Sequence, residues 1–127
     1  MKCNMAKVLF IVRNYVPQLE ILKLADAFIS HGGLNSVSEA LYYEVPVAAI
    51  PIANDQPAVA GRLEALGAGI MLRMDEITPQ ILRDTVYRLL MDENYRSASK
   101  TVGRSFAEAG GYKAAADAIL EYIGSRR

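Results

Sequence analysis

Short apolar runs recur along the first part of the chain and predict strands buried on both faces of a sheet. The third run, VAAI, lies between Pro46 and Pro51, and proline is excluded from the middle of a sheet because it has no N–H to donate. The four predicted strands are Val8–Val12, Ala27–Ser30, the VAAI run inside Pro46–Pro51, and Gly69–Leu72.

Helical spacing of apolar residues fills the segments between these runs. Thr78 is a favourable N-cap and Pro79 a favourable first helical residue, while Gly67 is a typical helix end. The predicted helices are Gln18–Leu24, Leu34–Tyr43, Pro57–Leu66, Thr78–Met91, Asn94–Glu108 and Lys113–Ile123. Alternating strands and helices predict an α/β, Rossmann-like parallel sheet of about four strands, with helices on both faces and a helical C-terminus.

Composition narrows the range of functions. The chain has 127 residues, enough for a single domain over 1–127, and 52% of them are hydrophobic. Lys and Arg balance Asp and Glu at 14 each, so no basic field favours nucleic acid or membrane binding. Cys3 and His31 each stand alone, which makes a zinc site improbable, and we expect no metal. The apolar run before Arg13 is too short to span a membrane, so a cytoplasmic protein is expected.

The stretch FISHGGLNSVSEAL carries the candidate chemistry, at the end of the second predicted strand and the start of a helix. Gly32 and Gly33 permit a sharp turn and a close backbone approach. A helix N-terminus then offers free N–H groups and the positive end of its dipole to phosphate oxygens. Asn35 and Ser36 add side-chain donors, and Glu39, one turn further on, suits the paired hydroxyls of a ribose.

An ordinary strand-to-helix turn is the alternative, with Ser36 or Asn35 as N-cap and His31 bonded to a backbone carbonyl. Two further segments favour a ligand site. Asp55 and Gln56 follow the third predicted strand, and the segment from Tyr15 to Gln18 follows the first. Because the carboxyl ends of parallel strands meet at one edge of a sheet, we expect these groups to share a site.

The run YVPQLEILKLADAFISHGGLNSVSEALYYEVPVAAIPIANDQ resembles the donor-binding signature of UDP-glycosyltransferases of the GT-B fold. It is most similar to the bacterial branch that modifies macrolides and flavonoids. The resemblance continues through GRLEALGAGIML and covers nearly the whole chain. It implies the C-terminal, donor-binding half of such an enzyme, with the N-terminal acceptor domain and the first strands of the C-terminal half absent.

The resemblance also implies residue roles. Tyr15 would stack on the uracil and Gln18 would contact its edge. His31, Asn35 and Ser36, with the Gly32–Gly33 turn, would hold the diphosphate, and Glu39 would bind the ribose. Asp55 and Gln56 would bind the transferred sugar. The general base is expected in the N-terminal domain, so we expect no catalytic residue here and give His31 an electrostatic role.

Two positions depart from the family pattern. Plant members usually carry tryptophan where Tyr15 stands, so a smaller ring should stack less extensively. Glu44 stands where the family commonly has glycine before Val45-Pro46, which should affect the end of the helix.

Three functions remain open. The chain is the donor-binding part of an enzyme that transfers a hexose from a UDP-sugar to a hydroxyl of a small acceptor, or a non-catalytic UDP-binding or assembly module that needs a partner. A weaker alternative is a Rossmann domain for another nucleotide. In each case we expect self-association through an exposed sheet edge or apolar face.

Overall fold

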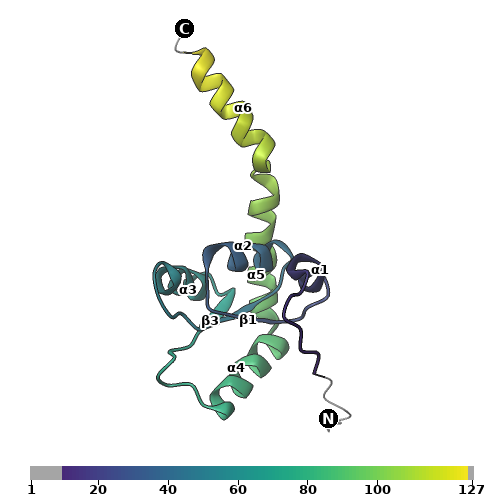
Figure 1. The fold of residues 1–127 in the computed structure, drawn as a ribbon, viewed down its shortest axis with the longest axis vertical. Coiled ribbons are helices and arrows are strands. Elements are labelled where there is room, and N and C mark those ends of the chain that lie inside the picture. Colours follow the sequence, from purple (N-terminus) through teal and green to yellow (C-terminus); the bar gives the residue numbers. More distant parts are fainter. Residues whose placement is uncertain (1–9, 126–127) are drawn as a thin grey trace.

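A three-stranded parallel sheet forms the centre of the protein in the computed structural model, which describes residues 10–125 (Figure 1). The strands are β1 (Phe28–Ser30), β2 (Val47–Ala49) and β3 (Gly69–Met71), and they lie in chain order. Phe28 pairs with Val47, which pairs with Gly69. The expected α/β class with a parallel sheet is therefore confirmed.

The helices lie close to their predicted positions. They are α1 (Gln18–Leu22), α2 (Leu34–Tyr42), α3 (Gln56–Ala65), α4 (Pro79–Met91), α5 (Glu93–Glu108) and α6 (Gly111–Gly124). The predicted cap of α4 is present, because the Thr78 hydroxyl accepts a hydrogen bond from the Ile81 N–H at 3.2 Å.

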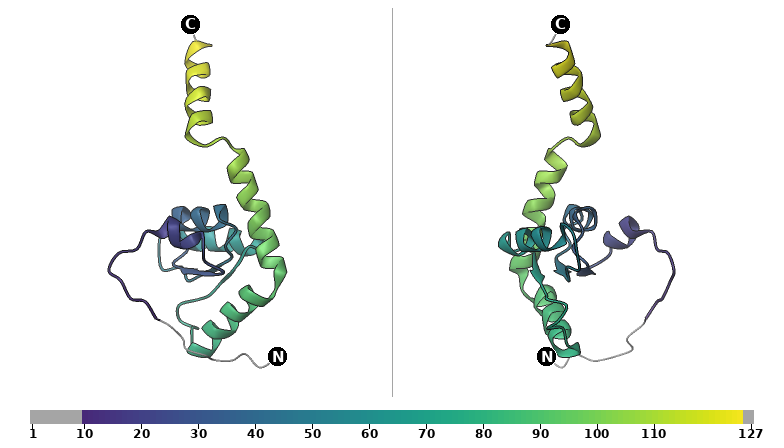
Figure 2. Two further views of the ribbon diagram at one scale, coloured as in Figure 1. Left: turned by 90° about the vertical axis from the view of Figure 1, so that its right-hand side faces the viewer. Right: turned by 60° about the vertical axis from the view of Figure 1, so that its left-hand side comes forward.

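Strand β2 separates two apolar clusters because its side chains alternate between the faces of the sheet. Val47 and Ala49 belong to the larger cluster, with residues of α2 and α3. Ala48 lies in the smaller one, with Ile70 of β3 and Leu89 of α4. Helices thus cover both faces, and Figure 2 shows α4 on the side of the sheet opposite α2.

The predicted strand at Val8–Val12 was wrong for residues 10–12, the part of it that the structure describes. Residues 8 and 9 lie outside the described residues, and the segment 10–12 has no strand conformation. Phe10 and Val12 are more than 80% exposed. A buried parallel strand needs a neighbour on which to form its backbone hydrogen bonds, and no described strand pairs with this segment.

Helix α5 packs across the end of α2, and α6 projects beyond the rest of the protein (Figures 1 and 2). The close approach occurs at Gly103, where an added Cβ would lie 2.2 Å from the Leu41 carbonyl oxygen. No residue of α6 is buried. Among the described residues, no helix combines the length and the apolar character needed to cross a membrane.

Candidate functional site

Helix α2 begins at the carboxyl end of β1 without a side-chain cap. Its N-cap is Gly33, and the first hydrogen bond of the helical pattern runs from the Val37 N–H to the Gly33 carbonyl at 3.0 Å. The N–H groups of residues 34–36 therefore have no partner within the helix. Together with the helix dipole they form a local positive end that can bind an anion.

The two glycines hold this turn close to the sheet. Gly32 has φ +81°, which a residue with a side chain rarely adopts, and an added Cβ would lie 3.3 Å from the Ala49 Cβ. Gly33 has an ordinary φ of −63°. A Cβ there would lie 2.5 Å from His31 Nε2, so the imidazole lies directly against Gly33.

A hollow of about 490 Å³ opens at this turn, and we call it the turn hollow. Asp55, which follows β2, contributes to its wall, so the ends of β1 and β2 meet as expected. Its lining consists of His31, Gly33, Leu34, Asn35, Ser36 and Asp55. His31, Asn35 and Asp55 are exposed, and Ser36 is half-buried.

The ordinary-turn alternative required a side-chain cap on α2 and a hydrogen-bonded histidine. Neither Asn35 nor Ser36 caps the helix. Within residues 10–125, the His31 side chain has no hydrogen bond or ion pair. The N–H groups at the start of α2 and the His31 imidazole are therefore available to a ligand.

A second hollow, of about 690 Å³, lies beside the first, and we call it the loop hollow. Residues 14–20 form most of its wall, and Glu39 of α2 completes it. The Gln18 amide nitrogen Nε2 donates to Glu39 Oε2 at 2.6 Å and lies 3.4 Å from Ser36 Oγ. Since Ser36 lines the turn hollow, these contacts connect the two hollows. Tyr15, also on the wall of the loop hollow, is 84% exposed.

Gln56 does not line either hollow. Its Oε1 atom accepts hydrogen bonds from the N–H groups of Ile52 and Ala53, at 2.8 and 3.0 Å. This arrangement holds the loop after β2, in which Asn54 has a positive φ of 58°. The structure thus brings eight of the ten expected residues onto the two hollows, with Gly32 buried beneath the turn and Gln56 in a supporting position.

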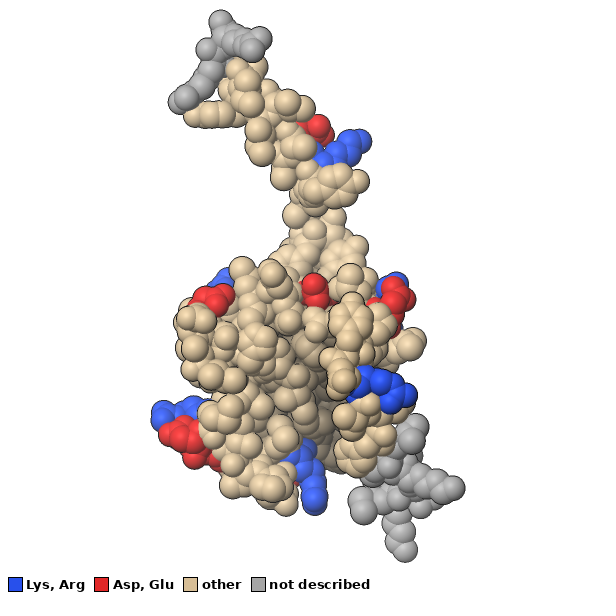
Figure 3. Space-filling model, viewed as in Figure 1, with Lys and Arg blue, Asp and Glu red and all other residues tan. Residues whose placement is uncertain are grey.

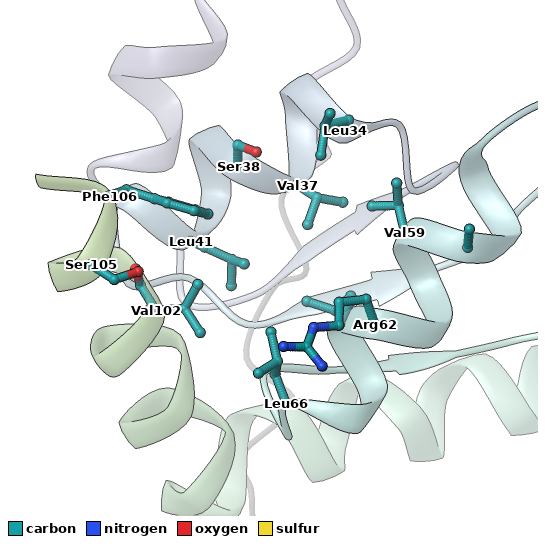
Figure 4. A pocket seen from close by; sticks show the side chains of 12 residues that line it. Leu34, Val37, Ser38, Leu41, Val59, Arg62, Leu66, Val102, Ser105 and Phe106 are labelled. Carbon is teal, nitrogen blue, oxygen red and sulfur yellow. The ribbon is translucent and has the colours of Figure 1, made fainter. Parts of the chain in front are cut away.

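Sequence reasoning missed an apolar groove of about 560 Å³ between α2, α3 and α5 (Figure 4). Leu34, Leu66 and Phe106 are exposed parts of its wall, and Arg62 is its charged residue. The available signal was the presence of large apolar residues outside the buried stripe of each helix. The groove is separate from the polar groups of the turn, and we call it the α2–α3–α5 groove.

Charge gives no sign of a polyanion or membrane surface on the face seen in Figure 3. Charged side chains of both signs lie scattered around its margins, and most of this face is uncharged. This agrees with the balanced composition. The local positive end of α2 arises from the turn itself, and the face seen in Figure 3 carries no broad basic surface.

Comparison with known proteins gives a consistent result. Residues 3–111 match the family described as "Erythromycin biosynthesis protein CIII-like, C-terminal domain". The chain is 46% identical over 114 residues to an uncharacterized UDP-glucosyltransferase of Bacillus subtilis, YojK, covering 90% of this chain and 28% of that protein. The chain therefore spans less than a third of the length of this relative.

Two solved structures show the same fold. The calicheamicin glycosyltransferase CalG4 has a TM-score of 0.84 and 32% identity, covering 89% of this chain and 30% of its own. The glycosyltransferase VinC, in complex with dTDP, has a TM-score of 0.81 and 25% identity, covering 91% of this chain and 29% of its own. The chain belongs to the erythromycin biosynthesis protein CIII-like C-terminal domain family, and its fold is that of the C-terminal half of a GT-B glycosyltransferase.

Proposed function

We propose that this chain binds the nucleoside diphosphate of a UDP-sugar and is the donor-binding part of a hexosyltransferase acting on a hydroxyl of a small acceptor. The uncapped start of α2 beside His31 is the observation that carries the proposal. The dTDP complex of VinC and the UDP-glucosyltransferase relative support a nucleotide-sugar ligand.

Each part of the ligand has a place in the proposal. The diphosphate lies in the turn hollow, on the α2 N–H groups with His31, Asn35 and Ser36. The ribose hydroxyls donate to Glu39, one helical turn further along. The sugar lies near Asp55 and Gln56.

Tyr15 and Gln18 complete the donor site in this proposal. Tyr15, on the wall of the loop hollow, stacks on the uracil. Gln18 directs its Nε2 atom to Glu39 and Ser36, so its Oε1 atom is the group left to accept from the uracil N–H. The same amide holds Glu39 beside the ribose.

His31 acts by electrostatics in this proposal. As the bond between the sugar and the diphosphate breaks, negative charge grows on the phosphate oxygens, and preorganised donors stabilise it. The base that deprotonates the acceptor comes from an acceptor-binding partner domain, and direct displacement inverts the anomeric carbon. The outer edge of β1, with which no other described strand pairs, is the surface proposed for further strands or self-association. The cytoplasmic location stays a prediction.

Calorimetric titration of UDP and of uridine into the purified chain tests the donor site. His31→Ala should weaken UDP about ten-fold or more, because a hydrogen bond to a charged group contributes ~1.5–3 kcal/mol. The same variant should leave uridine unchanged, whereas Glu39→Ala should weaken both ligands. Glu108→Ala, which removes an exposed carboxylate at the end of α5, is the matched control.

Binding of UDP that neither His31→Ala nor Glu39→Ala affects would reject the proposed site. A chain that binds UDP but transfers no hexose from a UDP-sugar, even when an acceptor-binding domain of a relative is added, would favour the non-catalytic module.

A further inference from the structure

The loop between β2 and α3 is held by a side chain at its own end. Gln56 is the first residue of α3 and is half-buried. Its Oε1 atom accepts hydrogen bonds from the Ile52 N–H at 2.8 Å and from the Ala53 N–H at 3.0 Å. The Gln56 N–H donates to the Ala53 carbonyl at 3.3 Å. Asn54 lies between them with a φ of 58°, a conformation that is costly for a non-glycine residue and needs support from its surroundings.

Asp55, in the same loop, has no contact of its own that fixes its carboxylate. The residue is exposed and its side chain does not cap α3. Within residues 10–125 this carboxylate has no hydrogen bond or ion pair. Its position in the wall of the turn hollow is therefore decided by the backbone of the loop. Since Gln56 holds that backbone, the position of the Asp55 carboxylate depends on the Gln56 side chain.

The backbone of Gln56 is itself fixed against the glycine turn. A Cβ added at Gly32 would lie 3.7 Å from the Gln56 carbonyl oxygen and 3.7 Å from the Ala60 Cβ. The start of α3 therefore packs directly against the turn that leads into the turn hollow. Gln56 thus connects the part of the site proposed for the diphosphate with the loop that carries Asp55.

We propose that Gln56 is a positioning residue for the transferred sugar: through its Oε1 atom it holds the loop 52–55 so that the Asp55 carboxylate meets hydroxyls of the hexose. This inference rests on the proposed function, which places the sugar beside Asp55. The Gln56 Nε2 atom has no partner within residues 10–125 and is free to donate to a sugar hydroxyl, whereas Oε1 serves the loop. A loop that is already ordered binds the sugar without a further loss of conformational entropy.

Two substitutions separate the acceptor of this amide from its donor. Gln56→Glu keeps an oxygen for the two loop N–H groups, whereas Gln56→Met keeps only a similar side-chain length, and neither variant has the Nε2 donor. Any difference between the two variants therefore comes from the acceptor. Calorimetric titration of UDP and of UDP-glucose gives the ratio of the two affinities for each chain, which cancels effects on the shared nucleotide. The affinity for UDP-glucose relative to UDP should be about five-fold or more lower in Gln56→Met than in Gln56→Glu.

Asp55→Ala decides whether Gln56 acts through its neighbour. Because the Asp55 side chain makes no hydrogen bond and no cap, this substitution removes the carboxylate without breaking a contact of the loop. In the Asp55→Ala background the two Gln56 variants should have the same affinity ratio, because coupled residues are not additive in a double-mutant cycle. Gln80→Glu and Gln80→Met, at an exposed position of α4, are the matched controls and should keep the ratio of the parent chain.

Amide proton NMR tests the loop contact without any ligand. A carboxylate forms shorter hydrogen bonds than an amide oxygen does, so the Ile52 and Ala53 amide protons should move downfield in Gln56→Glu. The same two signals should move upfield in Gln56→Met, in which both hydrogen bonds are lost.

Three results would each overturn the inference: unmoved amide signals, equal affinity ratios in the two Gln56 variants, or a difference between them that persists without the Asp55 carboxylate. As long as the parent chain binds UDP, these results leave the proposed function standing. A parent chain that binds no UDP would reject the proposed function, and this inference with it.

Discussion

Glu44 ends α2 in a backbone conformation that a residue with a side chain adopts at a cost. Its φ is +62°, its N–H bonds to the Leu41 carbonyl, and the next N–H, of Val45, bonds to the Ala40 carbonyl. This is the Schellman arrangement, in which glycine is the usual residue at this position. Gly67, with φ +70°, ends α3 through the same pair of hydrogen bonds. The chain thus contains one motif twice, once with glycine and once with glutamate.

Glu44→Gly should therefore stabilise the fold. The left-handed conformation costs a non-glycine residue ~1–2 kcal/mol. Glycine avoids this cost, but its greater conformational freedom stabilises the unfolded chain by ~0.4–1 kcal/mol. The pair between Glu44 and Lys100, at 4.0 Å and about half exposed, is a surface ion pair that contributes little. The expected net gain in the free energy of unfolding is ~0.5–1 kcal/mol.

Urea unfolding followed by circular dichroism measures this gain. Gly67→Ala is the reverse experiment and should lower stability by about 1 kcal/mol. Its added Cβ would meet only Ala98 Cβ at 3.8 Å, an ordinary contact, so backbone strain alone is changed. Glu44→Ala removes the charge but keeps the Cβ and should change stability by less than ~0.5 kcal/mol. A stabilising Glu44→Ala, or a Glu44→Gly chain no more stable than the parent, would refute the backbone explanation.

Three further predictions use the same methods or the UDP titration. Gly33→Ala keeps an allowed φ but places its Cβ against the His31 imidazole. The free energy of unfolding should therefore stay the same while the affinity for UDP falls. An unchanged affinity for UDP would contradict the assigned position of the His31 ring. Gly103→Ala should destabilise by ~2 kcal/mol or more because α5 must move from α2, whereas Gly61→Ala, with open space around it, should stabilise by ~0.5–1 kcal/mol. The hydrogen bond from Arg73, together with its charge, lowers the pKa of Asp75 in the folded protein. Asp75 therefore stabilises the fold above its unfolded pKa. This stabilisation is lost as the pH falls through the folded pKa. Asp75→Asn should therefore slightly reduce the fall in the free energy of unfolding at acidic pH. High salt should have the same effect on the parent chain, because it screens this exposed ion pair.

Local sequence signals predicted most of the fold because they act over a few residues. The prolines around VAAI delimited β2, and Thr78-Pro79 located the start of α4. The strand prediction failed at residues 10–12 because an apolar run shows a tendency to be buried and cannot show which strand would lie beside it. Glu44 departs from the family glycine in sequence, but its positive φ became visible only in the structure.

The candidate site was predictable as a set of neighbours and less so in its internal contacts. The shared edge of a parallel sheet explains why Asp55 joins His31 at the turn hollow. Nothing in the sequence indicates that the Gln18 amide bonds to Glu39 or that the Gln56 carbonyl holds the loop after β2, because each depends on a rotamer and on a backbone path. The α2–α3–α5 groove was missed for a related reason, since three separate helices build it.

The unequal size of the two apolar clusters implies unequal cooperativity across the sheet. Among the residues that the structure describes, the cluster that includes α2 and α3 contains ten buried residues, and the one that holds α4 contains three. Opening of α4 exposes little apolar surface, so its backbone amides should exchange with solvent through partial unfolding. The amides of α2 should exchange only through global unfolding. The turn that presents His31 is built on the slowly exchanging side. Thermal fluctuations of the opposite layer should therefore leave the start of α2 in place.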